Sequence, residues 1–273
     1  MRVFQSPAEL KNELRSLDGS IGFVPTMGAL HNGHISLIKK AKEQNDIVVV
    51  SIFVNPTQFL KGEDLEKYPR RQDADKRVCE LAGVDYLFYP DANDIYEKDE
   101  VSLCAPNVRG YILEGSSRPG HFSGVLTVVM KLLNIVRPAN AYFGKKDAQQ
   151  LNLITLMAKQ MFMDVNIVPV DTMRDAFGLA LSSRNDYLSA QEREEALKIP
   201  ASLKKATSMI MSGICESDRI IEQMRAILSP LEISYVAVVD REFKPLQRVE
   251  PGNTIILVEA VSGTTRLLDN IWL

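Results

Sequence analysis

The sequence predicts an α/β protein, in which a Rossmann-like, doubly wound parallel sheet precedes a smaller C-terminal α+β domain. Apolar runs rich in β-branched residues alternate with helical periodicities through most of the chain, as a parallel sheet with crossover helices requires. The remaining C-terminal part carries helices first and then strand-like runs joined by short loops. The length of 273 residues allows between one and two domains.

The first domain is expected over residues 1–172, with nucleotide and substrate binding as its role. Its predicted strands are short apolar runs with little polar alternation, at 21–25, 46–54, 84–89, 141–143 and 165–170. Its predicted helices repeat apolar residues at helical spacing, near 7–17, 35–41, 74–82, 125–132 and 151–161. Ser6 and Pro7 mark the start of the first helix, while Gly83 and Pro138 end the third and fourth. Five strands separated by helices predict the doubly wound sheet.

The second domain is expected over residues 173–273. Ser189 to Glu192 has the form of a capping box and starts a long helical segment, and another helix begins near Ser217. Three strand-like runs follow, at 235–239, 254–261 and 265–272. Because their connecting loops are too short for crossover helices, these strands should form an antiparallel sheet.

Composition excludes several classes of protein. Apolar residues make up 45% and charged residues 25%, as in soluble globular proteins, and the longest apolar stretch, 47–54, is too short to cross a bilayer. The first twelve residues contain Pro7, Glu9 and Lys11, so no export signal is expected. The three cysteines are an odd number, lie far apart and form no C-x-x-C pair, which argues against a disulfide framework and a zinc knuckle and favours a reducing cytoplasm. A net charge of −3 gives no electrostatic basis for a nucleic-acid partner.

The best candidate site follows the first predicted strand, where the sequence reads PTMGALHNGH at residues 25–34. Ligands of open α/β sheets bind at the carboxyl ends of strands, and a helix N-terminus suits phosphate. Gly28 and Gly33 allow a close backbone approach, while His31 and His34 can both donate to phosphate oxygens. The alternative is a helix start with two solvated histidines. Together with His121 these residues could bind zinc, but no thiolate or carboxylate spacing supports a metal site.

Three further polar groups follow other predicted strands. Lys146 could neutralise phosphate charge and Asp147 could accept hydrogen bonds from ribose, although both also suit a solvated helix start. The run LSSRN at 181–185 offers two hydroxyls and a guanidinium for phosphate, or forms a simple turn before the capped helix. Gln58 and Gln150 can hold a small polar substrate, and otherwise are surface amides.

These motifs together resemble one family over essentially the whole chain: the pantothenate synthetases, or pantoate–β-alanine ligases, of the H-x-G-H nucleotidyltransferase superfamily. The motifs occur in the family's order, as FVPTMGALHNGH, FVNPTQF, YPR, RPGHFSGVLTVV, FGKKDAQQL and LSSRN. Two positions depart from common family forms, namely Lys145, where an acidic residue is frequent, and Leu181, where methionine is frequent.

The resemblance implies that the protein is an amide-forming ligase that makes pantothenate, a coenzyme A precursor. ATP and pantoate would form pantoyl adenylate and pyrophosphate, after which β-alanine would displace AMP. Mg²⁺ would accompany ATP, and the protein ligands of the metal are left open. A homodimer is also implied, with the smaller domain acting as a lid that keeps water from the adenylate.

The resemblance also assigns residues to these roles. His34, as proton donor, with His31, Lys146 and Arg184 would be catalytic. ATP binding would involve Met27, Gly28, Ala29, Leu30, His31, Asn32, Gly33, His34, Gly144, Lys145, Lys146, Asp147, Met173, Leu181, Ser182, Ser183 and Arg184. Gln58 and Gln150 would bind pantoate, and Gln58 would also contact β-alanine.

Two other hypotheses remain open on the sequence alone. The first is a superfamily enzyme that transfers a nucleotidyl group to a phosphorylated acceptor, which would keep the ATP motif without needing the paired glutamines. The second is a non-catalytic nucleotide sensor with the same fold, which the release of pyrophosphate would exclude.

Overall fold

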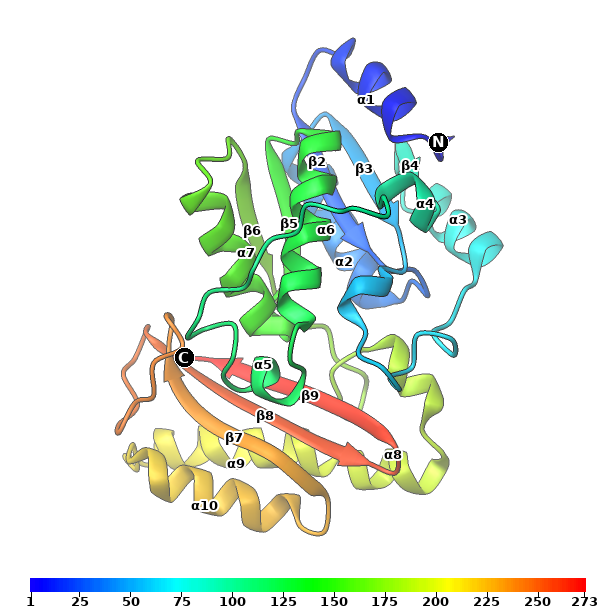
Figure 1. The fold of residues 1–273 in the computed structure, drawn as a ribbon. Coiled ribbons are helices and arrows are strands. Elements are labelled where there is room, and N and C mark those ends of the chain that lie inside the picture. Colours follow the sequence, from blue (N-terminus) through cyan, green and yellow to red (C-terminus); the bar gives the residue numbers. More distant parts are fainter. The chain divides into compact units, whose positions relative to one another are not determined.

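The computed structural model describes residues 1–273 as two compact units (Figure 1). The first unit comprises residues 1–145 and 149–171, and the second comprises residues 146–148 and 172–273. The short segment 146–148 thus groups with the C-terminal part of the chain, although its sequence neighbours belong to the first unit.

The first unit contains a six-stranded parallel sheet in the order β1-β4-β3-β2-β5-β6. Its strands are β1 (Arg2–Phe4), β2 (Ile21–Thr26), β3 (Ile47–Ile52), β4 (Tyr86–Phe88), β5 (Asn140–Gly144) and β6 (Asn166–Val170). The chain leaves β2 for β3 on one side, while β5 pairs with β2 on the other side. This reversal is the topological switch point of a doubly wound sheet, where ligands bind at the carboxyl ends of the strands.

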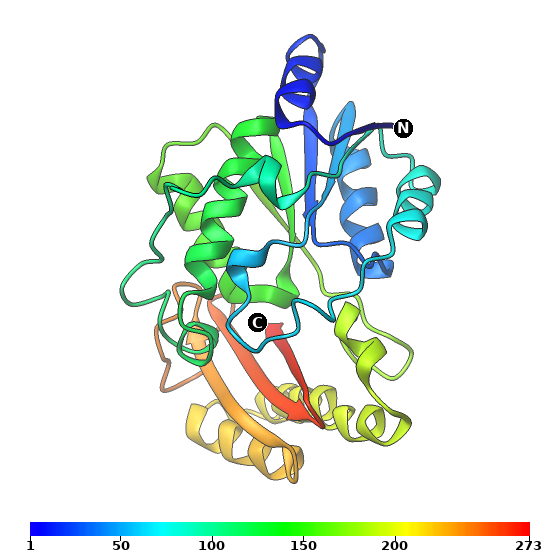
Figure 2. The same cartoon turned by 45° about the vertical axis from the view of Figure 1, so that its right-hand side comes forward.

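Helices cover both faces of this sheet (Figures 1 and 2). The helices of the first unit are α1 (Pro7–Arg15), α2 (Asn32–Gln44), α3 (Gln72–Leu81), α4 (Ala92–Ile95), α5 (Glu114–Ser117), α6 (His121–Val136) and α7 (Ala148–Gln160), of which the four-residue α4 and α5 lie in connecting segments. Apolar residues of α2 and the buried Cys79 of α3 pack against β2, β3, β4 and β5 on one face, while α1 contacts α6. Figure 1 shows α6 in front of the strands and α2 behind them. Burial raises the pKa of Cys79 to about 12, in keeping with its place in the apolar core.

The structure corrects the prediction of five strands, because the sheet has six. The sixth, β1, has only three residues and lies at the edge, in parallel register with Tyr86 to Phe88 of β4. The structure also adds the four-residue helix α5, which is not among the helices predicted from the sequence. The long helical segment expected after Ser189 is divided into two helices, α8 (Ala190–Ala196) and α9 (Lys198–Met211).

The second unit consists of helices packed on a three-stranded antiparallel sheet, as predicted. Its strands β7 (Glu232–Asp240), β8 (Thr254–Ser262) and β9 (Thr265–Trp272) lie in chain order. The helix α10 (Ser217–Leu228) and α9 bury their apolar faces against one face of this sheet. No helix in either unit is both long and apolar enough to cross a membrane.

Candidate functional site

The loop between β2 and α2 is fixed in an unusual backbone conformation by a buried carboxylate. Gly28 and Ala29 have φ angles of +86° and +50°, in the left-handed region that favours glycine. A Cβ atom at Gly28 would lie 3.0 Å from Asp75 Oδ2. Asp75, on α3 and only 2% exposed, accepts hydrogen bonds from the amides of Ala29 at 2.9 Å and Leu30 at 2.8 Å. Asp75 therefore holds the loop that carries the predicted nucleotide residues.

His31 and His34 lie side by side at the N-terminus of α2, with ring centroids 4.2 Å apart. The Nδ1 atom of His31 accepts a hydrogen bond from the Gly33 amide at 3.1 Å, and Nδ1 of His34 accepts one from the His31 amide at 3.2 Å. Since Nδ1 is an acceptor in both rings, each neutral imidazole carries its proton on Nε2. Two Nε2–H donors beside the positive end of a helix are suited to binding phosphate oxygens.

Gln58 is joined to the same loop through its side chain. It ends the 3₁₀ turn Pro56–Gln58 that follows β3, and its Nε2 donates to Met27 Sδ at 3.1 Å. Its Oε1 accepts from Asn55 Nδ2 at 3.0 Å, and Asn55 Oδ1 in turn accepts from the Tyr96 hydroxyl at 2.7 Å. The predicted substrate glutamine and a predicted nucleotide residue, Met27, are therefore direct neighbours.

The backbone of Gln58 is held by the third histidine and an ion pair. Its carbonyl oxygen accepts from His121 Nδ1 at 2.7 Å and from Arg118 Nη2 at 3.1 Å. Arg118 makes a two-point ion pair with Glu63, with distances of 2.7 and 2.5 Å. Burial alone would raise the pKa of Glu63, but hydrogen bonds from Arg118 and from the Leu60 amide outweigh it and hold this pKa below its ordinary value. His121 thus has a structural partner in Gln58.

The neighbouring residues Gln149 and Gln150 differ in their surroundings. Gln149 is buried, and its Nε2 donates hydrogen bonds to the carbonyl oxygens of Arg109 at 2.8 Å and Ile112 at 2.9 Å. Its Oε1 accepts a hydrogen bond from the Glu114 amide at 3.2 Å. Gln149 therefore shapes the loop 109–114. Gln150, one position further along α7, is half-buried and is the glutamine predicted to bind pantoate.

Two lysines follow β5, which ends at Gly144. Lys145 Nζ lies 2.6 Å from Asp171 Oδ1, within the first unit. Lys146 Nζ lies 3.2 Å from Asp147 Oδ1, within the second unit. The two adjacent cations thus have different acidic partners.

The other predicted nucleotide residues of the second unit lie on a turn. The carbonyl of Met173 accepts a hydrogen bond from the Leu181 amide at 2.9 Å, so these two residues are neighbours. Ser182 Oγ accepts from the Arg184 amide at 3.2 Å and caps a 3₁₀ turn that begins at Ser183. Ser182 therefore has a capping role beside its predicted role at phosphate.

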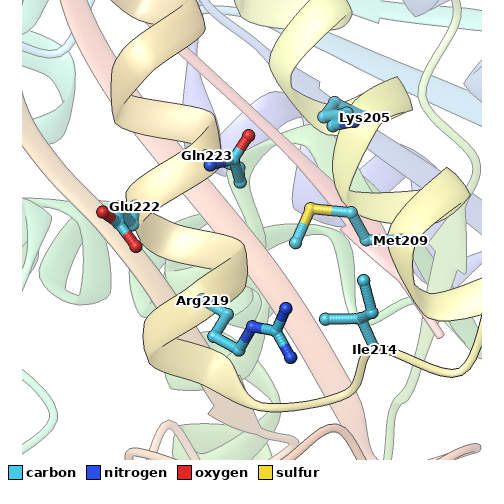
Figure 3. A pocket seen from close by; sticks show the side chains of 6 residues that line it. All are labelled: Lys205, Met209, Ile214, Arg219, Glu222 and Gln223. Carbon is cyan, nitrogen blue, oxygen red and sulfur yellow. The ribbon is translucent and has the colours of Figure 1, made fainter.

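A separate pocket in the second unit contains none of the predicted site residues. It lies between α9 and α10, encloses about 240 Å³, and is lined by Lys205, Met209, Ile214, Arg219, Glu222 and Gln223 (Figure 3). Figure 3 shows Met209 and Ile214 on one side, facing Arg219 and Gln223 of α10.

Two residues that organise the site, Asn55 and Asp75, were not assigned a role from the sequence. Asn55 belongs to the FVNPTQF motif, so its place beside Gln58 was a usable signal. Asp75 offered none, since a carboxylate in the charged first turn of a helix is typical of a solvated surface.

Comparison with known proteins points to one family. The family model described as Pantoate-beta-alanine ligase matches residues 2–272. Curated proteins named pantothenate synthetase, from Sulfurimonas denitrificans and Helicobacter pylori, are 67% and 44% identical over the full length of both chains. A crystal structure of the Thermus thermophilus enzyme has a TM-score of 0.95 at 38% identity, covering 99% of each chain. The Francisella tularensis pantoate-beta-alanine ligase, complexed with beta-gamma ATP and beta-alanine, has a TM-score of 0.84 at 39% identity, covering 99% and 97%.

Proposed function

The chain belongs to the pantoate-beta-alanine ligase family, and from this premise we propose that its site joins pantoate to β-alanine through a pantoyl adenylate. The enzyme is a ligase that forms an amide bond at the expense of ATP. The single observation that best supports the proposal is the arrangement of His31 and His34, whose Nε2–H donors stand at the N-terminus of α2 in the loop that also contacts Gln58.

The first half-reaction places negative charge where these groups can stabilise it. A pantoate carboxylate oxygen bonds to the α-phosphorus of ATP, and the bond from that phosphorus to the bridging oxygen breaks, so that pyrophosphate leaves. His34 donates from Nε2 to the departing oxygens, and His31, Lys146 and Arg184 stabilise phosphate charge. The backbone amides at the start of α2 contribute to the same stabilisation.

The second half-reaction forms the amide. Gln58 and Gln150 hold pantoate through its polar groups, and Gln58 also contacts β-alanine. The β-alanine nitrogen bonds to the acyl carbon, AMP leaves with the electron pair of the acyl–oxygen bond, and the nitrogen gives up its proton. The second unit serves as a lid in this proposal, because an acyl adenylate exposed to water would hydrolyse.

In this proposal, Mg²⁺ binds together with ATP. The structure contains no cluster of three His, Cys, Asp or Glu side chains that could hold a metal ion by themselves. Mg²⁺ in nucleotide enzymes usually keeps several waters and is bound by one or two carboxylates and by substrate phosphates, so this chain's residues fit an ion carried by ATP. Its chemistry there is to neutralise charge on the phosphates.

The assembly and location of the enzyme are further parts of the proposal. We expect a homodimer in the cytoplasm. Light scattering coupled to gel filtration should then give twice the chain mass of 30.5 kDa, and a mass of one chain at micromolar concentration would contradict the dimer.

Pyrophosphate exchange is the experiment that tests the proposed chemistry. Labelled pyrophosphate should exchange into ATP when pantoate and Mg²⁺ are present and β-alanine is absent, because adenylation is reversible and needs no amine. Exchange that required β-alanine would exclude a separate adenylate. Exchange with a phosphorylated acceptor in place of pantoate would favour another nucleotidyltransferase, and no exchange with any acceptor would favour a nucleotide sensor.

A further inference from the structure

Two buried residues near the end of β9, red in Figure 1, contact the two segments of the second unit that carry proposed nucleotide residues. Asp269 and Asn270 are only 2% and 3% exposed. As consecutive residues of a strand they point to opposite faces of the sheet. Their partners are accordingly different, although both partners lie in the same compact unit.

Asn270 holds the backbone of Lys146. Its Nδ2 donates to the Lys146 carbonyl at 2.7 Å, across 124 positions of sequence. Its Oδ1 accepts from Trp272 Nε1 at 2.8 Å. Since an indole N–H can only donate, the amide oxygen must face Trp272 and the amide nitrogen must face Lys146. The orientation of Asn270 is therefore determined by its surroundings.

Asp269 holds the turn that begins at Met173. Its carboxylate accepts hydrogen bonds from both terminal nitrogens of Arg174, with Nη1 at 2.5 Å from Oδ2 and Nη2 at 2.9 Å from Oδ1. Arg174 also donates to the carbonyls of Gly178 at 2.9 Å and Asn270 at 3.2 Å. A two-point pair of this kind fixes the guanidinium in plane as well as in distance. Arg174 is adjacent to Met173, whose carbonyl bonds Leu181, so the ion pair fixes the turn on which both lie.

From these contacts we propose that Asp269 and Asn270 are positioning residues for ATP. From adjacent positions of β9, they fix the Lys146 turn and the Met173–Leu181 turn relative to each other. The inference rests on the proposed roles of those turns in binding ATP. It gives β9 a function in adenylation, although neither side chain is assigned to the substrate. Catalysis depends on such support, because a displacement of about 1 Å can cost on the order of a hundredfold in rate.

The first test removes the Asn270 contact in two ways. Asn270→Ala deletes both hydrogen bonds, and Asn270→Asp keeps the shape while replacing the donor with an acceptor. Both variants should raise the KM for ATP in pyrophosphate exchange by roughly tenfold or more and leave the KM for β-alanine in the complete reaction unchanged. Because the two variants differ in charge, agreement between them assigns the effect to the lost donor. Unchanged ATP kinetics in Asn270→Ala would overturn the proposal.

A matched pair of buried acids separates positioning from general stability. Asp269 and Glu259 both lie buried in the same sheet and each pairs with an arginine, Glu259 Oε1 accepting from Arg266 Nε at 3.1 Å. Asp269→Asn should raise the KM for ATP, while Glu259→Gln should lower the melting temperature and leave that KM within about twofold. Equal effects of both substitutions on the KM for ATP would overturn the proposal.

A milder variant covers the case in which Asn270→Ala does not fold. Trp272→Phe removes only the hydrogen bond that orients Asn270 and keeps an aromatic face for Arg241, whose guanidinium carbon lies 4.5 Å from the Trp272 ring centroid. It should raise the KM for ATP by roughly two- to fivefold relative to the wild-type enzyme, because the Lys146 contact of Asn270 remains, and an unchanged value would overturn the proposal. Absence of exchange in the wild-type enzyme would instead refute the proposed function.

Discussion

Lys145 and Lys146 are adjacent in the chain but should differ sharply in their effect on catalysis. Lys145 forms an ion pair with Asp171, whereas the backbone of Lys146 is fixed by Asn270 and its ammonium is proposed to stabilise phosphate charge. Lys146→Ala should slow pyrophosphate exchange about a hundredfold, the usual effect of losing one preorganised charge contact of about 2.7–4 kcal/mol. Lys145→Ala, at a position predicted to bind ATP but not to act in catalysis, should raise the KM for ATP and change the rate at saturating ATP by less than about threefold. Equal losses in both variants would contradict this division of roles.

Asp75 should affect ATP binding through the backbone of the loop between β2 and α2, which leads to His31. In Asp75→Asn only one side-chain oxygen remains to accept from the amides of Ala29 and Leu30, and the new NH₂ group faces the other amide. We expect a loss of about 1.5–3 kcal/mol in the free energy of unfolding, together with a higher KM for ATP. Asp73→Asn makes the same change at an exposed position of α3 and should be nearly neutral. Urea titration and exchange kinetics of both variants check this, and a normal KM for ATP in Asp75→Asn would refute it.

At the scale of elements, the ion pair between Glu63 and Arg118 joins the segment after β3 to the C-terminal end of α5, and its contribution to stability should depend on pH. The pKa of Glu63 lies below its ordinary value near 4.5 in the folded protein. Its contribution to stability is therefore complete above that value and is lost as the pH falls through the folded pKa. His121, which lies 3.1 Å from Arg118, is the other titratable side chain in this cluster.

Urea unfolding at a series of pH values measures this contribution. Wild-type protein should lose more free energy of unfolding between about pH 5 and pH 3 than Glu63→Gln does, because the variant cannot titrate at this position. Glu66→Gln, at an exposed position of the same segment, should follow the wild-type curve. Parallel curves for wild type and Glu63→Gln would show that the ion pair does not contribute.

Elements that lie within a longer apolar run could be predicted from the sequence, as β4 was from the run 84–89, and elements without such a run could not. The strands β2, β3 and β6 are nearly continuous apolar runs, and the helix α2 repeats apolar residues at helical spacing, so the sequence shows a signal for each. By contrast, β1 has three residues and α5 has four, which is too few to show any period. The strand β1 forms only by pairing with β4, which includes the hydrogen bond from the Arg2 amide to the Asp85 carbonyl. Because this contact joins distant parts of the chain, the local sequence carries no signal for it.

Dependence on contacts between distant parts of the chain also limits what the sequence can predict about the candidate site. Motif residues such as His31, His34 and Gln58 could be proposed from the sequence, because chemistry and order along the chain single them out, and their roles stay predictions. Asp75, which holds the loop before His31, and Asn270, which holds the backbone of Lys146, could not be proposed, because each acts through a contact with the backbone of a distant segment.

At the scale of the whole molecule, the sequence indicated a single change of pattern near residue 172, and the roles assigned to the parts on either side stay predictions. The compact units divide the chain less simply, because residues 146–148 group with the C-terminal part. The contact of Asn270 with Lys146 gives a physical reason for this grouping. A hydrogen bond between residues 124 positions apart joins the turn that follows β5 to the second unit. A boundary of this kind depends on tertiary contacts and leaves no compositional signal.

The whole enzyme must also keep its intermediate until the amine arrives, since a free acyl adenylate would be lost to water. Enzyme incubated with labelled pantoate, ATP and Mg²⁺ should retain labelled pantoyl adenylate after rapid gel filtration. When β-alanine and a large excess of unlabelled pantoate are then added, the retained label should appear in pantothenate undiluted, because bound adenylate reacts faster than it is released. His34→Ala should retain less label, since its adenylation should be slowed while the glutamines proposed to bind pantoate are intact. If the product instead carried the diluted label of the bulk pantoate, the adenylate would leave the enzyme or never form separately. The two cases differ in the exchange assay, because a released adenylate still permits pyrophosphate exchange without β-alanine, whereas a concerted reaction does not.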